Sequence, residues 1–320
     1  MYSMTEKQWW SGRVDHATDP AYFRFHQAIQ LKDIASCKQD NDLKESIALL
    51  GFSSDEGVRR NKGRVGAAKA PYEIRSVLAN LAYHLEKLSL FDVGNVSCID
   101  QQLEASQEEL GKYMHYLLRA QSTPIILGGG HETLYGHYLG ARQYANQTTK
   151  LGIINMDAHF DLRNDFPPTS GTMFKQILEQ DKYAGYLCLG IQKWGNTQAL
   201  FQEAAQYQSN YIFAEDVAND SQTIKVIDDF TKQHDYIIFT LCMDAVEATA
   251  APGVSAPSPL GLEPKIVRDL IRYIVAKPNV LSMDISEVNP VVDENNKTVK
   301  LAAYFIAEAM QSIQNRKNML

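Results

Sequence analysis

Short apolar segments alternate with longer amphipathic segments along most of the chain. The apolar segments carry hydrophobic residues at consecutive positions, a pattern typical of strands that helices cover on both faces. We therefore predict eight strands, at residues 46–52, 89–96, 123–129, 150–157, 185–191, 210–215, 235–243 and 279–285. Helices are predicted around them at residues 71–84, 103–121, 132–145, 172–181, 197–208, 221–233, 263–276 and 299–315.

This alternation predicts an α/β fold with a mostly parallel sheet. Eight strands also suit a closed βα barrel, and the pattern alone does not distinguish a barrel from an open sheet. No internal repeat, low-complexity tract or linker divides the sequence. We predict a single domain over residues 1–320, in which residues 1–45 form an N-terminal extension that packs on the rest.

The composition limits the class of partner. The chain has 320 residues, of which 45% are hydrophobic and 22% charged, as in an ordinary globular protein. A formal net charge of −7 gives no reason to expect nucleic-acid binding, and no apolar run is long enough to span a membrane. The four cysteines are widely spaced, and no secretory apolar region follows "MYSMTEKQWWSGR". Reduced thiols and a cytoplasmic location are therefore expected.

Polar side chains collect where four of the predicted strands end. Because the chemistry of α/β proteins lies beyond the carboxyl ends of their strands, we expect these side chains to form the site. The segments are "GGGHET" with His131, "MDAHFDLR" with Asp157, His159 and Asp161, "TLCMDA" with Cys242 and Asp244, and "MDISEVNP" with Asp284 and Glu287.

The D-x-H-x-D segment is the strongest sign of a metal site. If it stays extended, Asp157, His159 and Asp161 point the same way, as Cys242 and Asp244 would on their own strand. Ligand-type groups this close repel one another unless a cation holds them, and mixed carboxylate and imidazole donors suit Mn²⁺, Zn²⁺ or Fe²⁺. Adding His131 and Asp244 gives five donors, which suggests a pair of metals. Any one of these residues alone is more simply explained as a helix cap or, for Cys242, as a buried apolar side chain.

These segments resemble the motifs of the ureohydrolase family, which includes arginases, agmatinases and formimidoylglutamases. The resemblance covers residues 46 to 315 and implies a three-layer α/β/α fold with an eight-stranded parallel sheet, which would exclude the barrel. It also implies two Mn²⁺ ions per subunit, bound by His131, Asp157, His159, Asp161 and Asp244, together with position 242. Most members have an aspartate at that position, whereas this chain has Cys242, so we expect a weaker or more labile second metal site.

Two further stretches, residues 55–71 and 251–261, look most like formimidoylglutamases. The position at which arginases carry a proton-shuttling histidine, counted from Ser170 and Gly171, is Phe174 here. The resemblance therefore implies hydrolysis of N-formimidoyl-L-glutamate to glutamate and formamide in histidine breakdown. Asp161 would pass a proton to the leaving nitrogen, and Glu287 would pair with the amidine cation.

The glutamate half of that substrate requires arginines for its carboxylates. The candidates are Arg163, together with Arg59 and Arg64 from the local basic run "GVRRNKGR", which is equally well explained as a solvated loop with subunit contacts. An agmatinase or guanidinobutyrase, a metal-poor pseudoenzyme with a binding role, and an unrelated amidohydrolase-type barrel are the alternatives. Asp284 is expected to be either a group behind the metal ligands or a helix cap. The family resemblance also implies a homo-oligomer.

Overall fold

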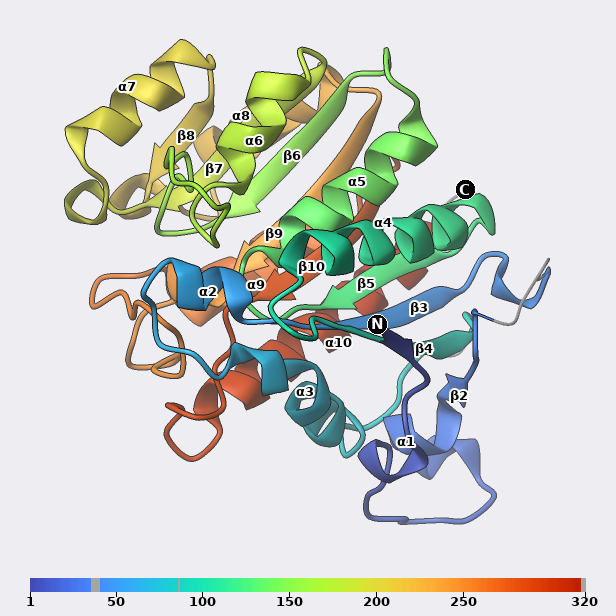
Figure 1. Ribbon diagram of the computed structural model, residues 1–320. Helices are drawn as coiled ribbons and strands as arrows, with labels where there is room; N and C mark the ends of the chain where they lie inside the picture. The colour runs from blue at the N-terminus through green and yellow to red at the C-terminus, as the bar shows by residue number, and fades with distance from the viewer. Residues whose placement is uncertain (36–40, 86, 318–320) are drawn as a thin grey trace.

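A single twisted sheet runs through the molecule, with helices on both of its faces (Figure 1). The computed structural model describes residues 1–35, 41–85 and 87–317, so that Cys37 lies outside the described part. Its strands are β1 (Tyr2–Ser3), β2 (Gln30–Leu31), β3 (Ile47–Ser53), β4 (Leu90–Ser97), β5 (Thr123–Leu127), β6 (Leu151–Met156), β7 (Ala184–Ile191), β8 (Asn210–Phe213), β9 (Tyr236–Cys242) and β10 (Val280–Ser286).

The sheet is open, in the order β1-β4-β3-β5-β10-β9-β6-β7-β8, and β2 pairs with β4. All pairs are parallel except the one between β1 and β4. The eight predicted strands correspond to β3–β10 with small differences at their ends. The expected count of eight was too low for the described residues, because β1 and β2 are two-residue strands that leave no periodic signal in the sequence.

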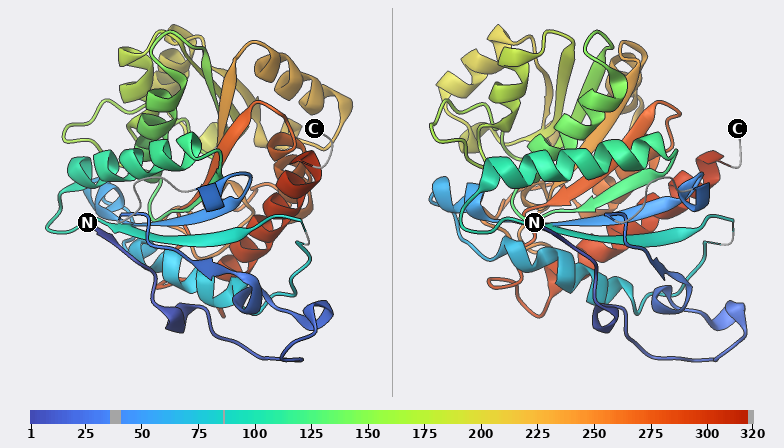
Figure 2. Two further views of the ribbon diagram at one scale, coloured as in Figure 1. Left: turned by 90° about the vertical axis from the view of Figure 1, so that its right-hand side faces the viewer. Right: turned by 45° about the vertical axis from the view of Figure 1, so that its right-hand side comes forward.

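Helices form the outer two layers. Buried residues of α4, α5 and α6 pack on one face of the sheet, and those of α3, α8, α9 and α10 pack on the other. The left view of Figure 2 shows the sheet between these two layers. The helices are α1 (Phe25–Ala28), α2 (Glu56–Arg60), α3 (Ala70–Leu78), α4 (Leu103–Arg119), α5 (Thr133–Ala145), α6 (Met173–Gln180), α7 (Gln198–Gln206), α8 (Ser221–Lys232), α9 (Pro264–Val275) and α10 (Lys297–Lys317).

A buried ion pair ties the N-terminal segment to the sheet. Arg75 on α3 forms a bidentate pair with Asp92 on β4, at 2.7 and 3.0 Å, and both side chains are fully buried. Trp10 Nε1 and Thr5 Oγ1 donate to the same carboxylate. A buried carboxylate is costly unless its oxygens accept hydrogen bonds. These bonds to Asp92 therefore hold Thr5 and Trp10, near the N-terminus, against β4.

Four adjacent central strands, β5, β10, β9 and β6, end at the same edge of the sheet. The segments that follow them carry the polar side chains that the sequence singled out. No helix in the described part of the chain is long and apolar enough to cross a lipid bilayer.

Candidate metal centre

His131 follows β5 through a run of three glycines that brings the backbone close to its neighbours. A Cβ on Gly129 would lie 1.9 Å from the carbonyl oxygen of Ser54, so only glycine fits there. The backbone N–H of His131 donates to Glu287 Oε1 at 2.9 Å. This hydrogen bond ties the backbone of His131, after β5, to the Glu287 carboxyl group, after β10.

The segment from Asp157 to Asp161 is an irregular loop and not an extension of β6, which ends at Met156. The segment does not stay extended, so the condition under which Asp157, His159 and Asp161 would point the same way is not met. Side chains from elsewhere satisfy the backbone of this loop: Asn196 bonds the Phe160 N–H and the Ala158 carbonyl, and Tyr186 donates to the Phe160 carbonyl. Asp161 is held at φ 49°, in the left-handed region that costs a non-glycine residue energy.

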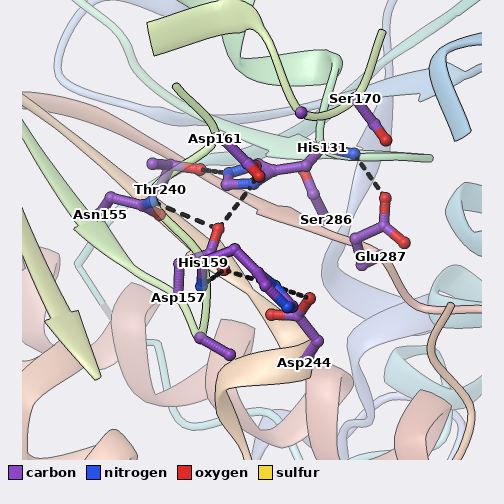
Figure 3. A network of polar contacts seen from close by, with 12 residues as sticks. His131, Asn155, Asp157, His159, Asp161, Ser170, Thr240, Asp244, Ser286 and Glu287 are labelled. Carbon is purple, nitrogen blue, oxygen red and sulfur yellow. Dashed lines mark hydrogen bonds and ion pairs between the residues drawn. The ribbon is translucent and has the colours of Figure 1, made fainter. Parts of the chain in front are cut away.

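The loop nevertheless brings its ligand-type side chains together (Figure 3). His131 Nδ1 lies 2.9 Å from Asp157 Oδ2 and 3.0 Å from Asp161 Oδ2. His159 Nδ1 lies 3.1 Å from Asp244 Oδ2, and the His159 backbone N–H donates to Asp157 Oδ1 at 2.7 Å. The structure thus brings His131, Asp157, His159, Asp161 and Asp244 together in one place.

Cys242 and Asp244 reach the cluster by a route different from the expected one. β9 ends at Cys242, and residues Met243–Ala245 form a 3₁₀ turn rather than a continuation of the strand. The turn still directs both side chains to the cluster. Cys242, His131 and Asp157 form one group whose ligand atoms all lie within 4.8 Å of one another, and Asp157, His159 and Asp244 form a second.

The histidines and carboxylates of the cluster shift one another's pKa values. Burial lowers the pKa of His131, but the Asp157 and Asp161 carboxylates outweigh it, so that the pKa lies well above its usual value. The pKa of His159 is raised in the same way, against burial, by Asp244 and Asp157. Although burial opposes it, the two imidazoles hold the pKa of Asp157 well below its usual value. The imidazoles and carboxylates thus interact strongly with one another, and a divalent cation bound among them would neutralise the carboxylate charge.

Two further observations indicate that the donor set suits a metal ion. Asp244 Oδ1 is buried and has no hydrogen-bond partner among the described residues, so a coordination position points into the cluster unused. Burial and the nearby Asp157, Asp244 and Glu287 carboxylates raise the pKa of the Cys242 thiol well above its usual value. A bound cation reverses this effect, since a coordinating thiol is deprotonated.

Glu287 faces the same space from the end of β10. Burial, with Glu132 and Asp244 nearby, raises the pKa of Glu287 to about 8. Its backbone has φ 66°, so it shares the left-handed strain of Asp161. Glu132, which lies behind it, is fully buried and accepts from Ser54 Oγ and the Gly57 N–H, and burial raises its pKa to about 7.

A pocket of about 100 Å³ opens over the cluster. Arg163 lines this pocket, and among the described residues its guanidinium makes one hydrogen bond, from Nη1 to Asn61 Oδ1 at 3.3 Å. Asn61 Nδ2 donates to Ser170 Oγ, also at 3.3 Å. The residues that line the pocket are Asn61, His131, His159, Asp161, Arg163, Ser170, Gly195, Leu200, Cys242, Asp244, Ser255, Ala256 and Glu287.

Arg59 and Arg64, the other two arginines that the sequence assigned to the substrate, do not line the pocket. The Arg59 guanidinium forms a bidentate pair with Glu56 on its own helix. Arg64 donates through Nε and Nη2 to the carbonyls of Ser255 and Val254. Arg64 therefore supports a wall of the pocket from outside.

Several residues of the site were not found from the sequence. Asn61 and Ser255 lie in loops, and nothing in their neighbours' periodicity marks them. Ser170 served only to locate Phe174, which is buried, stacked on Tyr186 at 4.0 Å and edge-on to His131. Asp284 lies behind the ligands and caps no helix: it accepts from the Thr240 hydroxyl, and His137 contacts it from α5.

Comparison with known proteins places these features in a family context. The model of the arginase family matches residues 45–311. A formimidoylglutamase of Geobacillus sp. (strain WCH70) is 51% identical over 99% of this chain and 98% of its own. A formimidoylglutamase of Lysinibacillus sphaericus (strain C3-41) is 47% identical over 98% of both chains.

Solved structures agree. The Bacillus subtilis formimidoylglutamase superposes with a TM-score of 0.81 at 24% identity, over 94% of this chain and 95% of that one, and shows the same fold. The Trypanosoma cruzi formiminoglutamase with Mn²⁺ superposes with a TM-score of 0.78 at 26% identity, over 88% of this chain and 97% of that one.

Proposed function

The chain belongs to the arginase family, and we propose that it hydrolyses N-formimidoyl-L-glutamate to L-glutamate and formamide in histidine degradation. The observation that carries this proposal is one pocket with three kinds of group on its surface: a metal-type donor cluster, the carboxyl group of Glu287 and the guanidinium of Arg163. A formimidoyl group needs the first two, and a glutamate carboxylate needs the third. The names of the full-length relatives support the same substrate.

We propose that the cluster binds two Mn²⁺ ions per subunit. His131 and Cys242 would bind one ion, His159 and Asp244 the other, and Asp157 both, because it belongs to both ligand groups. Asp161, 3.0 Å from His131 Nδ1, would complete the donor set. When bound, the ions would activate a water molecule for attack on the formimidoyl carbon at neutral pH.

The reaction needs a group that moves one proton. Water adds across the C=N bond of the formimidoyl group, with its oxygen on the carbon. The bond from that carbon to the glutamate nitrogen then breaks, and the nitrogen leaves as an amine after gaining a proton. Asp161 faces the pocket, and burial with the nearby Asp157 raises its pKa to about 6. A cluster residue that faces the pocket would lie beside both the activated water and the leaving nitrogen, so Asp161 is the proposed carrier of this proton.

Glu287 is proposed to bind the amidine, which is a cation at neutral pH. Burial and the neighbouring Glu132 and Asp244 raise its pKa to about 8, which favours the protonated carboxyl group near neutrality. An approaching cation lowers the pKa and leaves an ion pair. The His131 backbone N–H, bonded to Oε1, holds the carboxylate in place for that pairing.

Arg163 is proposed to bind a carboxylate of the glutamate half, because its guanidinium retains donors that face the pocket. Asn61 and Ser170 beside it would supply further polar contacts. An agmatinase or guanidinobutyrase is the second candidate within the family. Agmatine has no carboxylate for Arg163, and Phe174 replaces the proton-shuttling histidine expected of an arginase.

Three further predictions stay with this proposal. We expect one domain that includes residues 1–45, assembly into a homo-oligomer, and a cytoplasmic location. The proposed partner is the small-molecule substrate alone, without nucleic acid or membrane.

A substrate panel tests the proposal, with purified protein, Mn²⁺ and a thiol reductant. We expect kcat/KM for formimidoylglutamate to exceed those for arginine, agmatine and guanidinobutyrate by orders of magnitude. A charge-assisted hydrogen bond contributes about 1.5–3 kcal/mol, so Arg163→Met should raise KM for formimidoylglutamate roughly 10- to 100-fold with a smaller change in kcat. Faster hydrolysis of agmatine, or an unchanged KM in Arg163→Met, would contradict the proposal.

A further inference from the structure

A chain of buried hydrogen bonds runs from His131 into the sheet. His131 Nε2 lies 3.0 Å from Thr240 Oγ1, and the Thr240 hydroxyl donates to Asp284 Oδ1 at 2.8 Å. Ser286 Oγ donates to the same oxygen at 2.9 Å. His137 Nδ1 lies 2.7 Å from the other oxygen, Asp284 Oδ2. These side chains are at most 1% exposed, so the chain is closed to solvent.

The sheet itself builds this chain. Thr240 on β9 and Asp284 on β10 are direct partners in the parallel register, so their side chains lie side by side on one face. Ser282 and Ser286 are two residues before and after Asp284 and share that face. His137 covers the face from α5, and its Nε2 lies 2.6 Å from Ser282 Oγ. The result is a row of polar side chains in an otherwise apolar interior. Burying such groups costs free energy even when they are hydrogen-bonded, which suggests that the row has a function.

The direction of the hydrogen bonds can be worked out from the number of protons available. A threonine hydroxyl has one proton, and Thr240 gives it to Asp284. The Thr240 oxygen can therefore only accept from His131, whose Nε2 must carry a proton. A histidine that binds a metal is neutral and has one N–H, so in that form a proton on Nε2 leaves Nδ1 with its lone pair. This is the atom that faces Asp157 and Asp161.

We propose that Thr240, oriented by Asp284, fixes His131 in the tautomer that presents Nδ1 to the metal, so that Thr240 and Asp284 are positioning residues of the metal centre. The inference rests on the proposed metal-binding role of His131. It concerns one of the two ligand groups, since neither Thr240 nor Asp284 contacts His159 or Asp244 in the described structure. Partners of this kind orient metal-ligating histidines, and their loss typically lowers metal affinity 10- to 100-fold.

Metal affinity is the direct test, measured by competition with a chelator. Thr240→Val keeps the shape of the side chain but removes the oxygen that accepts from His131. We expect the affinity of one of the two ions to fall roughly 10- to 100-fold and that of the other to change little. Thr240→Ser, which restores the hydroxyl, should recover most of the loss. A purely structural role would not give this recovery together with an effect on only one ion.

Ser286→Ala is the matched control. Ser286 donates to the same Asp284 oxygen as Thr240 but does not contact His131. If the bond to His131 matters, Ser286→Ala should retain nearly the metal affinity of the unaltered protein, whereas Asp284→Asn should lose it as Thr240→Val does. Equal losses in Ser286→Ala and Thr240→Val would overturn the proposal, because the effect would then be a general loosening of β10.

Two measurements separate this inference from the proposed function. If His131→Ala leaves metal content unchanged, the proposed metal centre fails. If His131→Ala loses an ion but Thr240→Val does not, only the positioning role fails. In Cd²⁺-loaded protein with ¹⁵N-labelled histidine, we expect His131 to show a protonated Nε2 with slow solvent exchange. A protonated Nδ1 or a rapidly exchanging Nε2 proton would also contradict the proposal.

Discussion

Cys242 stands at the position where the family resemblance led us to expect an aspartate. Its sulfur belongs to the same ligand group as His131 and Asp157. Thiolate is a softer ligand than Mn²⁺ prefers, whereas it suits Cd²⁺ and Zn²⁺. The geometry therefore allows a metal ion beside His131, Asp157 and Cys242. The thiolate would then influence which metal ion binds there most tightly.

Cys242→Asp should change metal preference. We expect the affinity for Mn²⁺ to rise and the ratio of Cd²⁺ to Mn²⁺ affinity to fall, because the carboxylate is the harder ligand. Metal content and competition titrations under reducing conditions would measure both. Cys188→Ala is the control, since its sulfur is equally buried but lies 3.7–3.8 Å from backbone carbonyls of the loop and in neither ligand group. An unchanged ratio in Cys242→Asp would show that the sulfur is not a ligand.

The sequence predicted the identity of the cluster residues but not their backbone geometry. The types and order of His131, Asp157 and Asp244 indicated a metal site without any coordinates. The left-handed backbone of Asp161 and Glu287 could not be predicted, since local propensity disfavours it for both residues. Contacts from distant segments impose it, such as the Gly129 carbonyl that accepts from the Glu287 N–H.

At the scale of elements, α2 and the loop after it form a wall of the pocket. Asn61, which follows α2, lines the pocket, and Arg64 bonds the carbonyls of Val254 and Ser255. Asn289 in turn donates to the carbonyl of Arg64. Three segments far apart in the sequence thus hold one another at the rim of the site.

Arg64→Met should therefore affect substrate binding without touching the chemistry. Loss of its two side-chain hydrogen bonds frees the backbone at Val254 and Ser255, and we expect KM to rise several-fold while kcat changes less than twofold. Arg59→Met is the control from the same segment, because Arg59 is half-exposed and pairs with Glu56 outside the pocket. Steady-state kinetics with formimidoylglutamate would measure both. A larger KM effect in Arg59→Met would instead support direct contact between Arg59 and the substrate.

The long elements could be predicted because each has its own pattern. The seven longer strands, β3–β7, β9 and β10, are apolar over most of their length, since helices cover both faces, and the long helices are amphipathic. α2 has five residues and too little periodicity to be recognised. The irregular path of residues 157–161 depends on Asn196 and Tyr186, which lie 35 and 25 residues after its last residue, Asp161. Short elements of this kind are set by long-range contacts rather than by local sequence.

The whole molecule carries an excess of buried acidic groups at one edge of its sheet. The family resemblance placed this edge, because the carboxyl ends of β5, β10, β9 and β6 must meet in an open parallel sheet. The sequence did not show which neighbouring groups offset the negative charge of these buried carboxylates. The pKa values of His131, His159, Glu287 and Glu132 are all raised, which favours their protonated forms and offsets part of the acidic charge.

Metal removal should therefore make folding stability depend on pH in a defined direction. Groups whose folded pKa is raised stabilise the fold fully below their unfolded pKa, and this contribution is lost as pH rises through the folded value. For Glu287 that window runs from the ordinary value of 4.5 to about 8, and for Glu132 from 4.5 to about 7. Asp157, with its lowered pKa, has the opposite sign, but its contribution is lost only in strong acid.

We expect the unfolding free energy of chelator-treated protein to fall between about pH 4.5 and 8, by about 1.4 kcal/mol per pH unit for each proton held by the folded state alone. Mn²⁺ competes with protons for its ligands, so metal affinity should rise with pH, and the gap in stability between loaded and metal-free protein should widen. Urea unfolding at several pH values, with Mn²⁺ or with EDTA, would measure both curves. Glu287→Gln, which is neutral at every pH, should flatten the EDTA curve. An EDTA curve that rises over this range would contradict the proton balance, because the cluster would then be stable with its carboxylates ionised and no cation among them.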